Sequence, residues 1–354
     1  MNDDRENPPA FTCPAPLAAT DRILLGHGSG GKLSADLIRE IFLPAFQNPV
    51  LARLDDQAIV TVNGTRLAFT TDSFVVSPLF FRGGNIGSLA VHGTINDLAM
   101  GGARPLFLSA AFIIEEGLPV ETLRRVVDSL HRAAKAASVE VVTGDTKVVE
   151  RGSGDELFIN TSGIGLVPQG VNLSANQARP GDRVLLSGSI GEHGIAILAE
   201  REGIEFDSPV MSDSAPLHTL VDALLAAAPG AIRCLRDPTR GGVSSTLNEI
   251  AGQSRVGIEI DERSVRVSEE VKGACELLGL DPLYVANEGK LIAFVAPEAA
   301  EAALAALRAH PLGGGAELIG TVTEAHPGMV TMRTLLGTMR IVDMLTGDQL
   351  PRIC

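Results

Sequence analysis

The sequence of 354 residues contains no long hydrophobic run. Charge, glycine or proline interrupts each apolar stretch before it reaches the roughly 20 residues that a membrane helix needs. The N-terminus lacks the basic and then apolar pattern of a signal peptide. The formal net charge is -14 and no dense basic block is present, which argues against a nucleic-acid partner. We therefore expect a cytoplasmic protein that contacts neither membrane nor nucleic acid.

Closely spaced cysteines are also missing. The four cysteines, Cys13, Cys234, Cys275 and Cys354, form no C-x-x-C pair, so neither a disulfide framework nor a zinc cluster is indicated. Cys234 and Cys275 have apolar neighbours and are expected to be small buried hydrophobes. Cys354 differs from them because it is the last residue of the chain.

Three common catalytic patterns are absent. The histidines show no H-x-x-x-H pair, the serines no G-x-S-x-G elbow, and the glycine-rich segment GHGSGGKLS (residues 26–34) is an incomplete phosphate loop. Its lysine, Lys32, is followed by Leu33 where a phosphate loop needs Ser or Thr to hold Mg²⁺. The segment is therefore expected to cradle an anion with backbone N–H groups and Lys32, while any metal is held elsewhere.

Length and composition predict two α/β or α+β domains. Residues 1–20 are rich in proline and read as a flexible extension. The turn residues Arg179-Pro180-Gly181-Asp182 separate an N-terminal domain (21–178) from a C-terminal domain (179–345). Residues 346–354 read as a flexible, exposed tail that carries Cys354.

Hydrophobic periodicity predicts the elements of each domain. In the first, we expect strands at 23–25, 56–62, 66–71, 106–114, 139–143 and 158–167, and helices at 34–42, 86–100 and 120–137. In the second, we expect strands at 183–187, 257–260, 291–295, 317–322 and 338–344, and helices at 195–201, 216–228, 242–251, 268–278 and 297–310. The Asn63-Gly64 pair predicts a hairpin between two of the strands.

Acidic residues recur at the junctions between apolar segments. They are Asp56, Asp72, Asp97, Asp145 and Asp237. Carboxylates that converge on phosphate groups are the ligands that Mg²⁺ uses in nucleotide sites. Any single aspartate is equally explained as a turn or helix-cap residue. The set as a whole favours a nucleotide–metal site.

Two further features bear on such a site. Lys147 follows Asp145 by two positions and is either a phosphate contact or a solvated surface lysine. Gly241 and Gly242, after Arg240, either let the backbone approach a ligand or form a helix-entry turn.

The terminal thiol of Cys354 is expected to be accessible. Pro351 keeps the segment extended, and from Gly347 the tail can reach on the order of 25 Å. This suits a thiol that is modified elsewhere and then enters an active site. The alternative is an accidental terminal cysteine, whose neighbouring carboxylate disfavours the thiolate.

Taken together, these motifs resemble the HypE family of hydrogenase maturation proteins over about residues 23–354. The resemblance rests on HGSGGKL, TTDSFVVSPLFFRGGNIGSLAVHGTINDLAMGGARP, FIIEEGL, VTGDTKVV, DPTRGGV, YVANEG and the terminal PRIC. The acidic motifs alone specify only the PurM-like superfamily of aminoimidazole ribonucleotide synthetase, thiamine monophosphate kinase and selenophosphate synthetase. The terminal Pro-Arg-x-Cys is similar to HypE specifically.

The resemblance implies a function and its partners. A terminal cysteine, here Cys354, receives a carbamoyl group from the carbamoyltransferase HypF. ATP then drives dehydration of the S-carboxamide to a thiocyanate, whose cyanide passes to iron on the HypC–HypD complex. Family members are homodimers that pair strands of their N-terminal domains.

The resemblance also implies site residues. Mg²⁺ would be held by Asp56, Asp72, Asp97 and Asp145. Nucleotide would be bound by Lys32, Asp72, Asp97, Gly144, Asp145, Thr146, Lys147 and Asp237. Catalysis would fall to Cys354, Lys147 and Glu288, with Glu288 as the base that removes the amide protons, because burial can raise its pKa. A turn or cap carboxylate is the alternative for Glu288.

Three other functions stay open at this point. Another ATP-dependent kinase or synthetase of the superfamily would keep its turnover without the tail. A non-catalytic nucleotide-binding scaffold would use the tail only to dock partners. A redox or metal-relay role for the terminal thiol is weakened by the lack of a second cysteine nearby.

Overall fold

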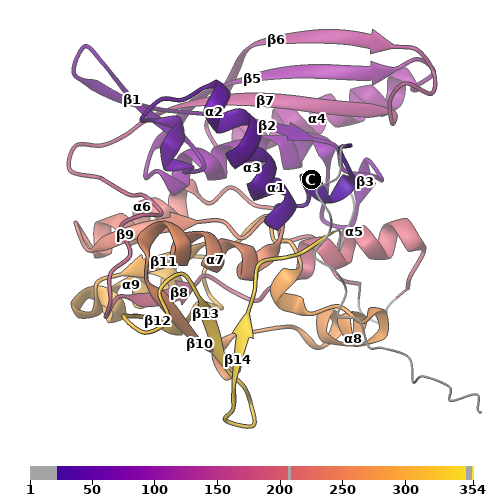
Figure 1. Cartoon of the computed structure of the whole chain (residues 1–354). Helices are drawn as coiled ribbons and strands as arrows, with labels where there is room; N and C mark the ends of the chain where they lie inside the picture. Colours follow the sequence, from indigo (N-terminus) through magenta and orange to yellow (C-terminus); the bar gives the residue numbers. More distant parts are fainter. Residues whose placement is uncertain (1–21, 206–208, 348–352) are drawn as a thin grey trace, which may run out of the picture.

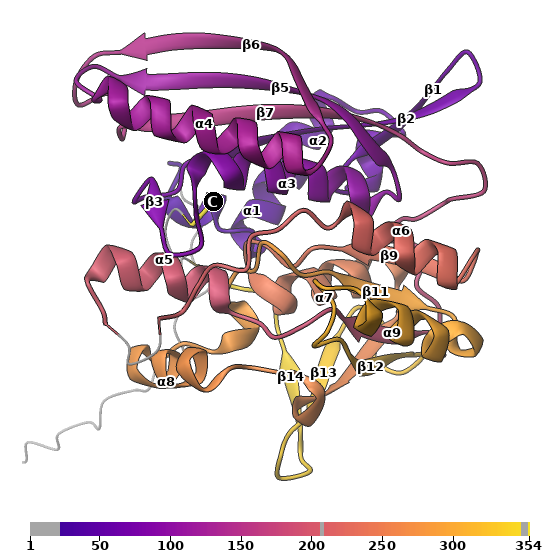
Figure 2. The same ribbon diagram turned by 180° about the vertical axis from the view of Figure 1, so that it is seen from behind.

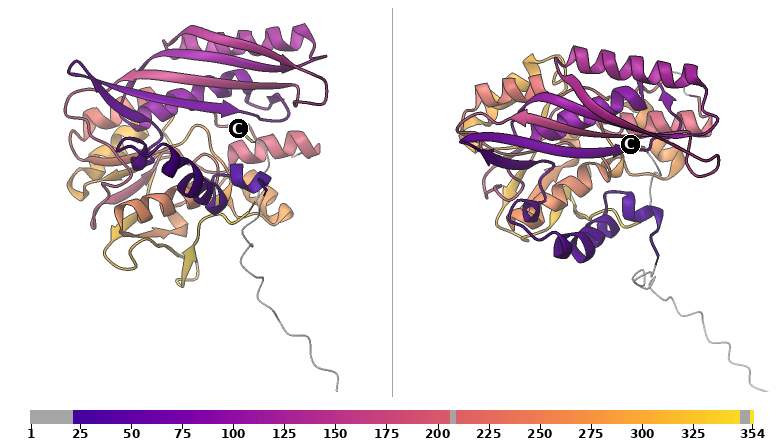
Figure 3. Two further views of the ribbon diagram at one scale, coloured as in Figure 1. Left: turned by 45° about the horizontal axis from the view of Figure 1, so that its top comes forward. Right: turned by 90° about the horizontal axis from the view of Figure 1, so that it is seen from above.

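The computed structural model describes residues 22–205, 209–347 and 353–354. One β-sheet is formed by the first half of the chain and lies over the second half, which contains the larger sheet (Figure 1, Figure 3). The C-terminus lies between the two halves (Figure 1). Interleaved strands and helices in both halves confirm the predicted α/β architecture.

The first half contains short helical turns, seven strands and two long helices in its described part. They are η1 (Leu25–Gly28), α1 (Lys32–Leu37), η2 (Ile38–Phe42), α2 (Leu43–Ala45), η3 (Leu51–Arg53), β1 (Ala58–Val62), β2 (Thr65–Phe74), β3 (Phe80–Phe81), β4 (Gly84–Asn85), α3 (Ile86–Met100), β5 (Arg104–Glu115), α4 (Val120–Ala136), β6 (Glu140–Val149) and β7 (Leu157–Leu166). The strand expected at 23–25 is wrong, since this segment turns into η1.

The first sheet has the strand order β1-β2-β7-β5-β6. Neighbours are antiparallel except β5 and β6, which are parallel because α4 crosses over between them. Helices α3 and α4 cover one face (Figure 2). On the other face, Phe69, Ile164 and Phe107 stand in register on β2, β7 and β5 and are 46%, 40% and 42% exposed. This row of the face is therefore apolar and open in the single chain.

Helix α3 is buried on nearly all sides because it lies between the first sheet and the second half of the chain. Its N-terminus is capped by Asn85, whose side chain accepts hydrogen bonds from the backbone N–H groups of Gly87 and Ser88. The fully buried Asn96 donates to the carbonyls of Ala215 and Glu288 and accepts from the N–H of Leu217. Asn96 thus ties α3 to two loops of the second half.

The second half contains the remaining elements. They are β8 (Arg183–Leu186), α5 (Glu192–Glu202), α6 (His218–Ala227), β9 (Ile232–Arg236), α7 (Gly242–Ser254), β10 (Gly257–Asp261), η4 (Glu262–Ser264), α8 (Glu269–Leu278), η5 (Pro282–Tyr284), β11 (Ile292–Val295), η6 (Pro297–Ala299), α9 (Ala300–Ala309), β12 (Glu317–Thr323), β13 (Val330–Arg333) and β14 (Met339–Val342). The sheet order is β14-β13-β10-β12-β8-β11-β9.

The core of the second half lies on both faces of this sheet. Leu186, Phe294 and Ile258 face α7 on one side, and Leu185, Val295 and Leu235 face α6 and α9 on the other. The strands β9 and β13 were not predicted from the sequence. No helix in the described ranges has the length and apolarity required to cross a membrane.

Candidate functional site

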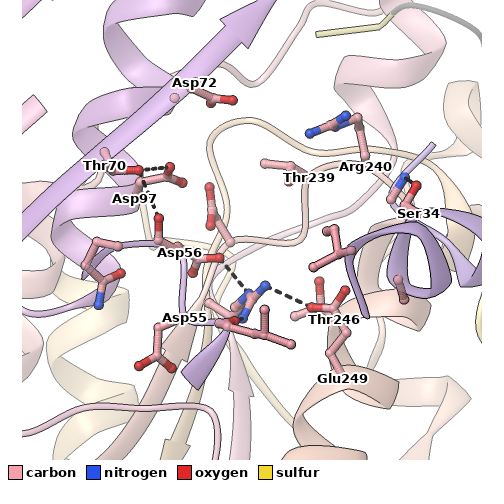
Figure 4. A pocket seen from close by; sticks show the side chains of 18 of the residues that line it. Ser34, Asp55, Asp56, Thr70, Asp72, Asp97, Thr239, Arg240, Thr246 and Glu249 are labelled. Atoms are coloured by element: carbon pink, nitrogen blue, oxygen red, sulfur yellow. Dashed lines mark hydrogen bonds and ion pairs between the residues drawn. The ribbon is translucent and has the colours of Figure 1, made fainter. Parts of the chain in front are cut away.

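A pocket of about 1000 Å³ opens between the two halves of the chain. Its walls come from the glycine-rich N-terminal segment, β2, α3, the connection between β9 and α7, and the loop that carries Glu288. Cys354, from the opposite end of the sequence, also lines it. Figure 4 shows Asp56, Asp72 and Asp97 directed into the pocket, with Arg240 and Thr239 across from them.

Three aspartates meet at the base of this pocket. Asp56 precedes β1, Asp97 lies in the last turns of α3, and Asp237 follows β9. One carboxylate oxygen from each lies within 4.8 Å of the others, a spacing that can hold a metal ion. Asp56 and Asp97 were predicted as metal ligands, whereas Asp237 was predicted as a nucleotide contact.

The charge of this cluster is only partly balanced. Arg236 lies 2.7 Å from Asp56, but its other side pairs with Glu249 at 2.9 Å. Burial, together with repulsion from neighbouring aspartates, raises the pKa of Asp97 well above its ordinary value. Burial also raises the pKa of Asp237 to about 6. One shared guanidinium cannot neutralise three carboxylates, so the donor set fits a divalent cation.

Hydroxyl and backbone contacts orient the cluster. Thr70, on β2, places its hydroxyl oxygen 2.8 Å from a carboxylate oxygen of Asp97 and 2.9 Å from the carbonyl oxygen of Asp56 (Figure 4). Asp72 lies two positions further on the same strand and the same face, and it also lines the pocket. Asp72 is outside the close trio, so its predicted role as a metal ligand stays a prediction.

A second group of charges surrounds Cys354. Glu288 is only 2% exposed, and burial followed by repulsion from Asp237 raises its pKa well above the ordinary value. Arg240 interacts electrostatically with Cys354 most strongly, and also with Asp72 and Glu288. The base predicted from the sequence thus lies in the same pocket as the predicted carrier.

The carboxyl end of the chain is docked inside the pocket. The backbone N–H of Val75 donates to a backbone oxygen of Cys354 at 2.9 Å. Cys354 is half-buried, and burial raises the pKa of its thiol to about 12. The thiol is therefore less exposed than one at the end of a free tail, because contacts with residues far away in the sequence hold the chain end. Pro351 and the leader at 1–20 lie outside the described residues.

The glycine-rich segment packs closely against other parts of the protein. A Cβ at Gly30 would lie 2.7 Å from Arg240, and one at Gly31 would meet the carbonyl oxygen of Leu345. The N–H of Gly30 donates to Ser34 Oγ and that of Lys32 to the Leu345 carbonyl. These two donors are occupied, and the Lys32 side chain is exposed and does not line the pocket. The glycines are needed for close packing.

Residues Gly144 to Lys147 lie away from the pocket in the single chain. Asp72, Thr161, Ala110 and Gly144 form one register row across β2, β7, β5 and β6. Three strand spacings separate the ends of this row, or about 14 Å. Asp145 and Lys147 alternate onto the open apolar face and pair with each other at 2.8 Å. Gly144 and Thr146 share the exposed edge strand, so none of the four lines the pocket.

Sequence reasoning missed three charged residues of the site. Arg236 and Arg240 flank Asp237 in RDPTR, and this alternation of charges after a buried strand was a usable signal. Asp213 accepts the backbone N–H of Glu288 at 3.0 Å and pairs with Lys290 at 3.0 Å. No local pattern marks Asp213, because its partners lie more than 70 positions away.

The chain matches two protein families and several known proteins. Residues 54–167 match the N-terminal domain of AIR synthase related protein, and residues 179–332 match its C-terminal domain. It is 58% identical over 336 residues to the carbamoyl dehydratase HypE of Rhizobium leguminosarum bv. viciae, covering 95% of this chain and 96% of that one.

Solved structures agree with these matches. A chain in the crystal structure of a HypE–HypF complex is 52% identical, with a TM-score of 0.83, over 87% of this chain and 99% of that one. A HypE crystallised with ATP is also 52% identical, with a TM-score of 0.79, over 94% and 100% of the two chains. The chain therefore belongs to the HypE family of AIR synthase related proteins.

Proposed function

We propose that this protein is an ATP-dependent carbamoyl dehydratase that acts on its own C-terminal cysteine. It converts an S-carbamoyl group on Cys354 into a thiocyanate, whose cyanide is donated to iron during assembly of the [NiFe]-hydrogenase cofactor. The observation that carries this proposal is the position of Cys354, which lines the acidic pocket together with Glu288. The 58% identity to a carbamoyl dehydratase supports it.

The reaction removes one oxygen and two protons from an amide. An amide oxygen is a poor leaving group, so the γ-phosphate of ATP is transferred to it first. The C–O bond then breaks and the oxygen departs with phosphate, while loss of both N–H protons forms the C≡N bond. The products are thiocyanate, ADP and phosphate. The sulfur keeps its bond to carbon throughout and serves as a tether.

Glu288 is the base for this proton removal. Its carboxylate is buried and lines the same pocket as Cys354. Burial raises its pKa, so the ionised carboxylate is a stronger proton acceptor than that of an exposed glutamate. The hydrogen bond from its backbone N–H to Asp213 fixes the loop that carries it. Arg240 places a permanent positive charge beside the carbamoyl group, where negative charge develops on the transferred oxygen.

Mg²⁺ is the cation that this site would hold. Asp56, Asp97 and Asp237 are the ligands we propose, with Asp72 as a further pocket carboxylate. When bound, the ion would neutralise the phosphate charges of ATP and align them for transfer. The same negative cluster keeps an uncomplexed anionic nucleotide out of the base of the pocket.

We propose that loading of the thiol takes place outside this pocket. A thiol whose pKa is about 12 is almost entirely protonated at neutral pH, and the thiolate is the nucleophile. We therefore propose that Cys354 leaves the pocket to receive its carbamoyl group from HypF and later to deliver cyanide to a HypC–HypD complex. A HypE–HypF complex is known for a relative that is 52% identical. We also propose a cytoplasmic location, where ATP is available.

A homodimer explains the open face of the first sheet. The predicted N-terminal domain, residues 21–178, exposes Phe69, Phe107 and Ile164 in one row there. We propose that a second copy covers this row. Asp145 and Lys147 project from the same face, so in a dimer they would meet the partner rather than solvent, and their predicted nucleotide contacts would be made across the interface.

Carrier and dehydratase can be tested together by intact mass. After incubation with HypF, carbamoyl phosphate and ATP, the protein should gain a carbamoyl adduct of about 43 Da, which loses water, about 18 Da, only with further Mg²⁺ and ATP. The Cys354→Ala variant should show neither change. An unmodified wild-type protein that still binds ATP would sink the dehydratase proposal in favour of a small-molecule kinase or synthetase.

Replacing Glu288 by Gln should block dehydration and spare the earlier steps. We expect the single-turnover dehydration rate to fall by roughly 10²–10⁴-fold, because a positioned base contributes about that factor. Carbamoyl loading and ATP affinity should stay unchanged. The matched control is Glu276→Gln on the exposed side of α8. A Glu288→Gln rate within about twofold of wild type would rule out this base.

Neutralising Asp97 should stabilise the metal-free protein. The raised pKa of Asp97 means that its ionisation costs folding energy, a cost that appears as pH rises through the raised value. In chelator at about pH 8, Asp97→Asn should be more stable by about 1–2 kcal/mol, and this difference should shrink towards about pH 4. Urea denaturation measures both effects.

Magnesium should reverse this order. Added Mg²⁺ should stabilise wild type more than Asp97→Asn, since the variant lacks one proposed ligand. The exposed Asp128→Asn variant on α4 is the control and should behave as wild type. An Asp97→Asn protein that is less stable than wild type without metal, or equally stabilised by Mg²⁺, would contradict the cluster's role.

A charge on the open sheet face should prevent dimerisation. Ile164→Glu would bury a carboxylate in the proposed apolar interface, and we expect it to sediment as a folded monomer while wild type sediments as a dimer. The control is Leu336→Glu, which changes a 92% exposed leucine in the turn between β13 and β14. A wild-type monomer at micromolar concentration would refute the proposed dimer.

A further inference from the structure

The penultimate residue of the chain, Ile353, packs into an apolar binding site, which we call the seat. The side chain of Ile353 is 5% exposed and belongs to a buried cluster that includes Phe74, Leu79, Phe81 and Ile197. These residues come from β2, the segment before α3, and α5. A terminal residue of an exposed tail would not be enclosed from both halves of the molecule. Ile353 is therefore the anchor of the docked chain end.

A buried histidine holds the backbone of this anchor. His193, in the first turn of α5, is fully buried, and its Nε2 lies 2.8 Å from the carbonyl oxygen of Ile353. Its Nδ1 lies 2.8 Å from Ser212 Oγ, and Phe81 packs edge-on against its ring with the ring centroids 5.7 Å apart. His193 does not line the ATP pocket, and no step of the dehydration uses it.

The hydrogen bonds define one protonation state for His193. Burial lowers its pKa, so the ring is neutral. A carbonyl oxygen can only accept, so Nε2 carries the proton and Nδ1 accepts from the hydroxyl of Ser212. Ser212 Oγ in turn accepts from the N–H of Ser214, and the N–H of Ser212 donates to the carbonyl of Arg82. Ser212 is thus fixed on several sides and orients the imidazole.

The same short segment also supports the base. Asp213, next to Ser212, accepts the N–H of Glu288 and pairs with Lys290. The segment of residues 212–214 therefore positions both reacting parts. It orients His193, which holds the chain end, and it fixes the loop of the base through Asp213. The bond from Val75 to Cys354 and the bond from His193 to Ile353 hold the backbone on both sides of the reacting cysteine.

We propose that His193 is a positioning residue, which donates a hydrogen bond to Ile353 and thereby seats Cys354 for dehydration. This builds on the proposed function but is a separate claim about how the chain end is recognised. The seat accepts the branched apolar side chain of Ile353 and the backbone of Cys354 that follows it. Loss of the Nε2–H donor leaves the Ile353 carbonyl buried and unpaired, which shifts the chain end out of the pocket.

Alkylation of Cys354 by iodoacetamide tests this seat without ATP or a carbamoyl group. Peptide mass spectrometry separates the adduct on Cys354 from those on other cysteines. His193→Gln keeps a donor near the position of Nε2, whereas His193→Asn keeps a polar group near Nδ1 only. We expect Asn to increase the alkylation rate of Cys354 by roughly five- to tenfold and Gln to stay within about twofold of wild type.

Single-turnover dehydration provides the second readout. The carbamoylated His193→Asn protein should lose rate by a similar roughly five- to tenfold factor, with its ATP affinity unchanged. The matched control is His92→Asn, which replaces another histidine that contacts the same segment, through Ser214, but not the tail. Thermal unfolding confirms that each variant is folded. If His193 variants do not fold, Ser212→Ala removes the orienting hydroxyl and should raise alkylation in the same direction.

Two results would overturn the proposal. Folded Asn and Gln variants, or a folded Ser212→Ala, that alkylate at the wild-type rate would show that the bond does not hold the tail. Equal acceleration by Asn and Gln would show that the imidazole only fills space. A protein with no dehydratase activity but the predicted alkylation pattern would refute the proposed function and leave the seat intact.

Discussion

Burial of like charges at one point is the constraint on which the rest of the site depends. Asp56, Asp97 and Asp237 converge from three separate segments of the chain. Glu288 lies close enough to this cluster for the charge of Asp237 to raise its pKa. Such a cluster destabilises a metal-free fold, because each ionised carboxylate raises the energy of the others. Arg236 and Arg240 compensate only in part. A divalent cation bound together with the nucleotide would neutralise the remaining negative charge.

The tethered substrate changes what this site has to do. In the proposed reaction, a carbamoyl group on Cys354 is held by the chain itself, so the pocket would need to bind only ATP from solution. Attachment replaces a bimolecular encounter with an intramolecular one, which lowers the entropic part of the barrier. Docking also lowers the reactivity of the thiol, since burial raises its pKa and disfavours the thiolate. The proposed function therefore separates the two steps in space: the thiol is carbamoylated outside the pocket, and the carbamoyl group is dehydrated inside it.

Much of the fold could be read from the sequence, because its signals are local. The periodicity of residues 86–100 and 120–136, the Asn-Gly hairpin and the alternation along β2 each depend on near neighbours. Asp56 and Asp97 could be singled out because acidic residues at the ends of apolar segments are informative. Glu288 was predicted only after the family resemblance, as the base that the dehydration requires. The positions of Asp145 and Cys354 could not be predicted, because each is set by contacts between segments that are distant in the sequence.

Asp145 and the glycine-rich segment illustrate this limit. Asp145 sits within a long edge strand, and only the register of β6 against β5 shows that it faces away from the pocket. The glycines at positions 30 and 31 are explained by Arg240 and Leu345, which lie more than 200 positions later in the chain. A motif records which residues are present but not the surfaces that they approach.

The most direct test of the account follows the oxygen atom of the carbamoyl group. The protein would be loaded with carbamoyl labelled by oxygen-18 and then given unlabelled ATP and Mg²⁺ in unlabelled water. If the amide oxygen is phosphorylated before it leaves, the label must appear in inorganic phosphate, with one labelled oxygen for each thiocyanate formed. Label recovered in water instead, with none in phosphate, would contradict the central claim.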